Sequence, residues 1–317
     1  MRPARFDRIV IEKPHSVFRL GDNAGAEDRE TAREVLMGVV PVGAAPPRWQ
    51  LYAGMPCWIE LVTPDVDSAR EFYAALFGWS YEQRNDSEGG HHLLALHEGF
   101  PVASLRTTAS GEDAKWRLFL ATGDCRAACE QAVERGACVT VAPSQLDGVG
   151  TKVVLEGPSN AEFGLLEPEA SWQFDVGLPG TLMWAELVTI KAQTADLFFQ
   201  DLFGYTDAQF GTENHLDYSV WYLGEESVLA RVSMLREHID ARTRPHWLLY
   251  LGVSEEVGTD EAVRRAVGAH GRVRVDPYDS ALGRAAVLRD PTGARFALVD
   301  PSRAPVGNAA NYDPYED

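Results

Sequence analysis

Cationic residues are scarce in this sequence, and they are not clustered. Its 317 residues include 29 Lys or Arg against 47 Asp or Glu, which gives a formal net charge of −18. Binding to nucleic acid or to an anionic membrane requires clustered cations that neutralise phosphate groups. The sequence therefore predicts no nucleic-acid partner and no membrane partner. An acidic surface suits a cationic or neutral ligand, and it also serves solubility.

Long apolar runs, cysteines and nucleotide-binding motifs are also absent or few. No stretch approaches the ~20 apolar residues of a membrane span, and Asp7, Glu12 and Asp22 interrupt the segment where a signal peptide needs its apolar core. Four cysteines are too few for a disulfide scaffold in a chain of this length. Without a Gly-rich phosphate loop or a nucleophile elbow, no nucleotide cofactor is expected. These absences predict a cytoplasmic protein.

An internal repeat organises the sequence. Residues 58–83 and 184–209 align without a gap, at an offset of 126 positions. Each copy begins with Trp-x-Glu-Leu-Val-Thr and later reaches Leu-Phe-Gly followed by an aromatic residue. A repeat of this length predicts two tandem domains.

Each copy of the repeat reads as a strand followed by a helix. Residues 57–63 alternate so that Trp58 and Glu60 share one face of a strand. Asp65 is the predicted N-cap of the helix that follows, and Gly78 is its predicted C-terminal residue. Between them, apolar residues recur at the spacing of one buried helical stripe. They are Ala69, Phe72, Tyr73, Leu76 and Phe77.

The strand–helix pattern restarts inside each copy, so each domain is predicted to contain two β-α-β-β-β units. Gly and Pro residues separate the two domains, and the C-terminal end is polar. The predicted parts are an N-terminal extension (1–50), a first domain (55–168), a linker (169–181), a second domain (182–301) and a tail (302–317). Within the extension, a short strand is predicted over residues 8–11 and a short helix over residues 31–40.

Two motifs carry a resemblance to a known family. The stretch from Asp65 to Trp79 contains Glu-Phe-Tyr and Leu-Phe-Gly-Trp, and residues 290–293 read Asp-Pro-Thr-Gly. Together they resemble the vicinal oxygen chelate superfamily, which includes glyoxalase I, extradiol dioxygenases and bleomycin-binding proteins. The most similar group is the two-domain, glyoxalase-like "hydroxylase" group of actinobacteria. The resemblance implies an α+β fold in which each domain forms a cupped mixed sheet around a ligand.

The resemblance also implies a divalent metal, held by the first strand, the strand that opens the second unit and the closing strand. Carried over to this sequence, these positions fall on Trp58, Trp116 or Arg117, and Gly164 in the first domain, and on Trp184, Trp247 or Leu248, and Ala297 in the second. Divalent metals bind imidazole, carboxylate or thiolate groups, none of which these residues supply. We therefore expect no metal and no other cofactor.

The repeated Trp-x-Glu places Glu60 and Glu186 as candidate catalytic residues. If the tryptophan faces the cup, the glutamate two positions later faces it too. Burial would raise the pKa of such a carboxyl and suit it to general acid–base catalysis. The alternative is structural, with each glutamate paired at the domain interface to Arg117, Arg231 or Arg295.

Other candidates complete the predicted site. His92 and His246 are candidates for proton transfer, although histidines more often lie on surfaces or in satisfied cores. Aromatic and cationic side chains could contact a flat or charged ligand, and the alternative for the tryptophans is ordinary core packing. The candidate ligand-binding residues are Trp58, Trp116, Trp184, Trp247, Arg117 and Tyr250.

The leading hypothesis is a metal-independent tailoring enzyme of secondary metabolism, such as antibiotic biosynthesis. It would catalyse the isomerisation, elimination or cyclisation of a small aromatic or cationic metabolite by acid–base chemistry. One alternative is non-catalytic sequestration of a natural product for self-resistance, and another is a metal-dependent lyase or dioxygenase. The expected assembly is a monomer with paired domains or a homodimer.

Overall fold

The computed structural model describes residues 51–85, 91–108, 112–210, 217–233 and 244–304. The strand and helix predicted within the extension over residues 1–50 lie outside the described residues, as does the tail beyond residue 304. The longest described helices have 12 residues, and none of the described helices could cross a membrane.

Two eight-stranded mixed sheets form the structure, one from each repeat. The first domain contains β1 (Pro56–Thr63), α2 (Val66–Phe77), β2 (Ser80–Asn85), β3 (His91–His97), β4 (Phe100–Thr107), β5 (Lys115–Ala121), α3 (Cys125–Glu134), β6 (Cys138–Leu146), β7 (Gly150–Glu156) and β8 (Glu162–Pro168). The second contains β9 (Leu182–Thr189), α4 (Ala192–Phe203), β10 (Thr206–Phe210), β11 (Tyr218–Leu223), β12 (Glu226–Ser233), β13 (His246–Gly252), α5 (Gly258–Gly268), β14 (Arg272–Ser280), β15 (Gly283–Arg289), β16 (Arg295–Asp300) and the short helix η2 (Pro301–Arg303). This arrangement confirms the predicted α+β fold of paired β-α-β-β-β units.

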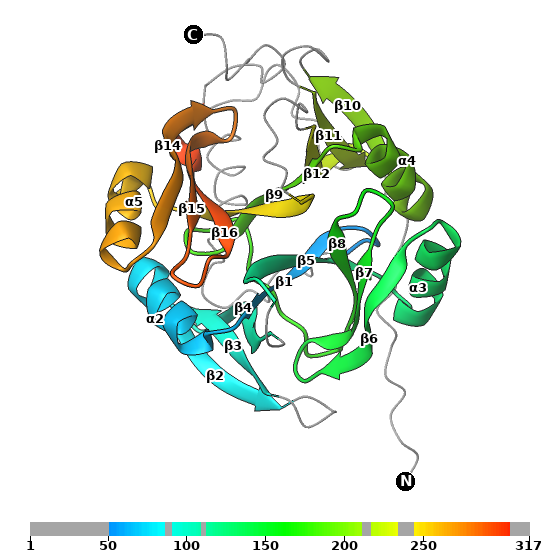
Figure 1. The fold of residues 1–317 in the computed structure, drawn as a ribbon, viewed down its shortest axis with the longest axis horizontal. Coiled ribbons are helices and arrows are strands. Elements are labelled where there is room, and N and C mark those ends of the chain that lie inside the picture. Colours follow the sequence, from blue (N-terminus) through cyan, green and yellow to red (C-terminus); the bar gives the residue numbers. More distant parts are fainter. Residues whose placement is uncertain (1–50, 86–90, 109–111, 211–216, 234–243, 305–317) are drawn as a thin grey trace, which may run out of the picture.

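Both sheets have the same strand order. The first runs β2-β3-β4-β1-β5-β8-β7-β6, and the second runs β10-β11-β12-β9-β13-β16-β15-β14. The strand that carries Trp-x-Glu therefore lies near the middle of each sheet, parallel to one neighbour and antiparallel to the other. Figure 1 shows the sheets curling, with the four units at four corners of the molecule.

The helix ends follow the capping residues. The Asp65 carboxylate accepts a hydrogen bond from Ser68 N at 2.9 Å, and Gly78 ends α2 in the left-handed conformation at φ 73°. Gly204 ends α4 in the same way at φ 75°. Glycine adopts this conformation without the steric cost that a side chain adds. At the N-terminus of α4, Lys191 stands in place of Asp65 and makes no side-chain cap.

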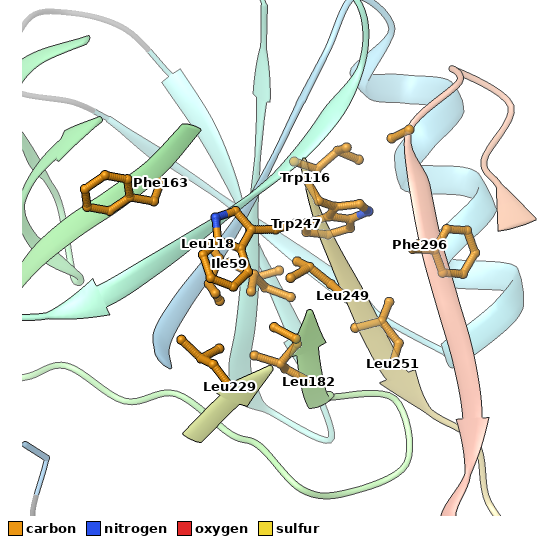
Figure 2. Packing of buried hydrophobic residues seen from close by; sticks show 14 of the residues in the cluster. Ile59, Trp116, Leu118, Phe163, Leu182, Leu229, Trp247, Leu249, Leu251 and Phe296 are labelled. Carbon is orange, nitrogen blue, oxygen red and sulfur yellow. The ribbon is translucent and has the colours of Figure 1, made fainter. Parts of the chain in front are cut away.

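One apolar core joins the two domains. Helix α2 of the first domain packs on α5 of the second, and α3 packs on α4 (Figure 1). The Phe72 ring lies 5.9 Å from that of Phe296, and the Phe163 ring lies 5.3 Å from that of Phe199. Figure 2 shows Phe163 and Phe296 on either side of this cluster, with Trp116 and Trp247 between them. Since each domain covers apolar surface of the other, the pair forms a single packing unit.

A buried hydrogen-bond chain crosses the domain boundary at Tyr73. The Tyr73 hydroxyl donates to Asp290 Oδ2 at 3.1 Å and accepts a hydrogen bond from Trp116 Nε1 at 3.0 Å. Asp290 belongs to the Asp-Pro-Thr-Gly turn before β16, and its Oδ1 accepts from the backbone N–H groups of that turn. The motif that resembles the family therefore anchors one domain to the other.

Replacing Tyr73 by phenylalanine is expected to destabilise the protein by about 1–3 kcal/mol, because it leaves two buried polar groups unpaired. Urea unfolding measures the change. Tyr81→Phe is the matched control, because the Tyr81 hydroxyl is also buried but has no hydrogen-bond partner among the described residues. Removing that hydroxyl should change stability little. Equal losses in the two variants would contradict a role for the Tyr73 chain.

Candidate functional site

The two Trp-x-Glu segments lie on the concave faces of their sheets. Ile59 and Leu61 belong to the cluster that packs on the helices, so the alternating residues Trp58 and Glu60 point the other way. In the second sheet, Trp184 packs with Tyr250 on the face opposite the helices. The two concave faces start from the same motif but differ in what surrounds it.

The first concave face is filled. Trp58 is 1% exposed, and its Nε1 donates a hydrogen bond to Ser104 Oγ at 3.0 Å. The linker between the domains supplies Trp172 and Phe174, and the Phe174 ring lies 5.4 Å from that of Trp58. The other buried side chains of this cluster are Cys57, Leu94, Phe119, Ala121, Leu146, Val149, Val154 and Leu166, and Leu51 and Leu96 also pack against it.

Glu60 is fully buried and surrounded by three cations. Lys152 Nζ donates to Glu60 Oε2, Arg117 Nη1 lies 3.6 Å from Oε1, and Arg106 Nε lies 3.8 Å from Oε1. Burial by itself raises the pKa of a carboxyl, but the charges of Lys152, Arg106 and Arg117 outweigh it and hold the pKa of Glu60 below its ordinary value. Glu60 is therefore a charged member of an ion cluster within the first domain.

No cation lies beside Glu186 among the described residues. Tyr218 donates a hydrogen bond to Glu186 Oε1 at 2.9 Å, and Tyr250 donates to Oε2 at 2.8 Å. Burial raises the pKa of Glu186 to about 7, and the two hydroxyl groups offset only part of that effect. A carboxyl with this pKa exists in both protonation states at neutral pH, as a general acid or base requires.

The strand registers show how the two glutamates came to differ. Glu60 pairs with Ser104 and Arg117 on neighbouring strands, and Glu186 pairs with Ala230 and Leu248. Each cation near Glu60 is matched by an apolar residue near Glu186. The matched pairs are Arg106 and Val232, Arg117 and Leu248, and Lys152 and Ala285. Because these three positions of the second sheet are apolar, none of them supplies a cation to Glu186.

The second concave face also leaves aromatic surface accessible. Trp184, Tyr218 and Tyr278 are partly exposed, whereas the equivalent Trp58 is covered. The Tyr278 hydroxyl interacts with that of Tyr250, which extends the hydrogen-bonded group around Glu186. A protonatable carboxyl beside partly exposed rings is an arrangement that can bind a flat ligand and exchange a proton with it.

The two candidate histidines have different surroundings. His246 lies on the same face as Glu186; its Nδ1 donates to Arg244 O at 2.9 Å, and its Nε2 accepts from Arg295 Nη1 at 3.0 Å. Burial is the main cause that lowers the pKa of His246 to about 4; the backbone hydrogen bond to Arg244 opposes it, and the charges of Arg295 and Arg289 act in the same direction as burial. His246 is therefore neutral and orients Arg295. His92 is buried at the position equivalent to Tyr218, 126 residues earlier.

The placement predicted for Trp116 and Trp247 requires a correction. Both indoles belong to the interdomain core on the helix side of the sheets, where the Trp247 ring lies 5.9 Å from that of Phe199. The strand positions beside the first-strand tryptophans are instead Phe119 in the first sheet and Tyr250 in the second. Arg117 lies on the concave face, but it contacts Glu60 and Glu162 rather than open surface.

The residues at the family's metal positions do not fit a divalent metal. By register these positions carry Trp58, Phe119 and Gly164 in the first sheet, and Trp184, Tyr250 and Ala297 in the second. None offers an imidazole, carboxylate or thiolate. Within the described ranges, no group of three His, Cys, Asp or Glu side chains is placed to hold a metal.

Some residues of the site were missed by the sequence prediction. Tyr218 stands 126 positions after His92, so applying the repeat offset to His92 could have identified it. Lys152 and the ring pair Trp172 and Phe174 carry no local signal, because their contacts with the Trp-x-Glu strand join distant parts of the chain.

Comparison with known proteins finds relatives over most of the chain. The family described as a glyoxalase-like domain matches residues 58–166. Anthracycline biosynthesis protein DauV of Streptomyces sp. (strain C5) is 31% identical over 263 residues, which cover 78% of this chain and 93% of DauV. Anthracycline biosynthesis protein DnrV of Streptomyces peucetius is 30% identical, with the same coverage of 78% and 93%.

Among solved structures, the Mn(II)-bound glyoxalase from Novosphingobium aromaticivorans has a similar fold. It superposes with a TM-score of 0.54 at 15% identity, over 83% of this chain and 91% of that one. At this level of identity, the likeness concerns the fold alone.

Proposed function

The chain belongs to the glyoxalase-like family of the vicinal oxygen chelate superfamily, and we propose that it is a tailoring enzyme of secondary metabolism whose active site is the concave face of the second sheet. The names of DauV and DnrV, both anthracycline biosynthesis proteins, support a secondary metabolite as its substrate. The partly exposed rings of Trp184 and Tyr218 suit an aromatic or polycyclic molecule.

The observation that carries the proposal is the environment of Glu186. Its carboxyl is buried, has no ion partner within the part of the chain that the structure describes, and has a pKa of about 7. In the proposed step, the Glu186 carboxylate takes a proton from a carbon next to a substrate carbonyl, which leaves an enolate. The same carboxyl then returns the proton at another position, or an adjacent leaving group departs as the carbonyl reforms. Isomerisation and elimination therefore share one first step.

The proposed step uses groups of this chain only. Tyr218 and Tyr250 donate hydrogen bonds to the Glu186 carboxylate oxygens, which stabilises the charged form and keeps the carboxyl oriented. The residues at the family's metal positions supply no metal-binding group. Both observations support acid–base chemistry that is independent of a metal.

Incubation of the purified protein with anthracycline-type polyketides in D₂O tests this proposal. Proton abstraction followed by return is expected to place deuterium at one carbon of the recovered substrate or product, and mass spectrometry measures it. Boiled protein is the control. Stoichiometric binding of a ligand that is recovered unchanged and unlabelled would instead indicate sequestration. Labelling that disappears after chelator treatment and returns with a divalent metal would indicate metal-dependent chemistry.

A further inference from the structure

Two arginines lie side by side on the concave face of the second sheet. Arg289 on β15 is the direct cross-strand neighbour of Arg295 on β16. Their side chains share a face with Val287 and Ala297, which belong to the apolar cluster of that concave face. Arg274 on β14 is close enough to affect the pKa of Arg295.

Neither arginine of this pair has a carboxylate partner among the described residues. Arg295 donates to the neutral His246, and Arg289 Nε is buried without any hydrogen-bond partner. Other arginines of the same domain are neutralised: Arg231 contacts both Asp196 and Asp217, and Arg284 contacts Asp260 and Asp279. Within the described part of the chain, the Arg289–Arg295 pair is thus a positive charge without a neutralising carboxylate, in a protein that is acidic as a whole.

The fold itself does not require these cations. The equivalent positions of the first sheet, matched through the β7–β8 and β15–β16 registers, carry the opposite charge. Glu156 stands in place of Arg289, and Glu162 stands in place of Arg295. Glu162 is neutralised by Lys115 and Arg117. The second sheet therefore carries the reversed charge at both positions, and no described carboxylate forms an ion pair with either arginine.

Keeping two cations together is unfavourable in the free protein. Like charges directly opposite each other on neighbouring strands are destabilising. Burial lowers the pKa of Arg295, and the charges of Arg289 and Arg274 lower it further. His246 stays neutral and adds no third charge. An anionic group placed against the pair would remove this repulsion and give Arg289 Nε an acceptor.

The pair lies in the same row of the sheet as Glu186. Leu248 pairs with Glu186, and the parallel register that joins Tyr250 to Ala297 brings Leu248 beside Arg295. Two strand spacings separate Glu186 from Arg295, which corresponds to about 10 Å. At that separation Arg295 is not among the causes that set the pKa of Glu186, which burial raises and the hydrogen bonds from Tyr250 and Tyr218 lower in part.

We propose that Arg289 and Arg295 bind an anionic oxygen group of the substrate, a carboxylate or an ionised hydroxyl, and so hold its reacting carbon at Glu186. The inference rests on the proposed function in one respect, that the second concave face is the active site. It also changes the expected ligand, because the net negative charge had suggested a cationic one. The local charge at the face is positive, and it is the local charge that a bound group meets.

Two fluorescent probes that differ only in charge test the inference. Anthracene-2-carboxylate is expected to bind the wild-type protein at least about tenfold more tightly than anthracene-2-carboxamide, as a charge-assisted arginine contact provides. Arg289→Met should reduce this preference to near one and leave the affinity for the carboxamide unchanged. Arg295→Lys, which keeps the charge, should retain part of the preference. Arg264→Met, an exposed helix position, is the charge-matched control and should retain all of it.

A second readout needs no probe. Arg289→Met should raise the melting temperature of the unliganded protein, because it removes the repulsion between neighbouring cations.

Equal affinities of wild type for the two probes, or a preference that survives the double substitution Arg289→Met with Arg295→Met, would overturn the inference. Glu186→Gln should keep the preference for the carboxylate probe, so a failure of the proposed chemistry and a failure of anion binding give different results.

Discussion

Replacing Glu186 by glutamine is expected to lower turnover, or deuterium labelling of the substrate, by about two to four orders of magnitude. Glutamine keeps the size of the side chain and can still accept a hydrogen bond from Tyr218 or Tyr250, but it cannot take up a proton. The variant should therefore fold and bind substrate while losing the chemical step. Glu226→Gln, at an exposed position of the same sheet, is the matched control and should keep full activity.

The same variant is expected to change how stability depends on pH. Glu186 holds its proton in the folded protein up to about pH 7, whereas in the unfolded chain it ionises near its ordinary pKa of 4.5. Its contribution, on the order of 3 kcal/mol, is therefore complete below pH 4.5 and is lost as the pH rises through 7. Urea unfolding of wild type and Glu186→Gln across this range measures the difference. Parallel pH profiles for the two proteins would show that Glu186 titrates normally.

Replacing Lys152 by methionine is expected to destabilise the protein by about 3 kcal/mol, because it removes the hydrogen-bonded partner of a fully buried carboxylate. Arg117 and Arg106 remain near Glu60, at 3.6 and 3.8 Å, and keep the loss at the lower end of the range for broken buried pairs. Guanidinium unfolding monitored by tryptophan fluorescence measures the change.

Two further variants separate a buried ion pair from the loss of a lysine as such. Lys115→Met also removes a cation from a glutamate, but Lys115 is 42% exposed, so its loss should cost less than about 1 kcal/mol. The double variant Glu60→Leu with Lys152→Met should recover part of the stability, because neither member of the hydrogen-bonded pair is left buried without the other and Arg117 keeps its contact with Glu162. A double variant as unstable as Lys152→Met would mean that the lysine acts through packing alone.

The fold could be predicted because its signals are local. The exact repeat offset, the two-residue alternation of residues 57–63 and the capping residues Asp65 and Gly78 each specify their own neighbourhood. Two polar, exposed edge strands carry little local signal. Ser80–Asn85 and Thr206–Phe210 contain no buried residue, so they carry no apolar alternation.

The site was harder to predict, for two physical reasons. A one-residue change of register moves every side chain of a strand to the other face. Trp116 pairs with Leu61 and Trp247 with Leu187 on the helix side, one residue from the concave-face positions Arg117 and Leu248, and the sequence prediction left the choice between these neighbours open. The other reason is sequence distance: Lys152 lies 92 residues from Glu60, and no local pattern reports that contact.

The aromatic linker gives the first concave face an occupant that belongs to the chain itself. Trp172 and Phe174 cover Trp58 there, and a segment held by a short tether has an effective concentration of the order of millimolar. A free metabolite would have to displace this resident group, whereas the corresponding Trp184 of the second sheet is partly exposed among the described residues. Together with the proposed active site on the second concave face, this asymmetry between the copies predicts one bound substrate per chain.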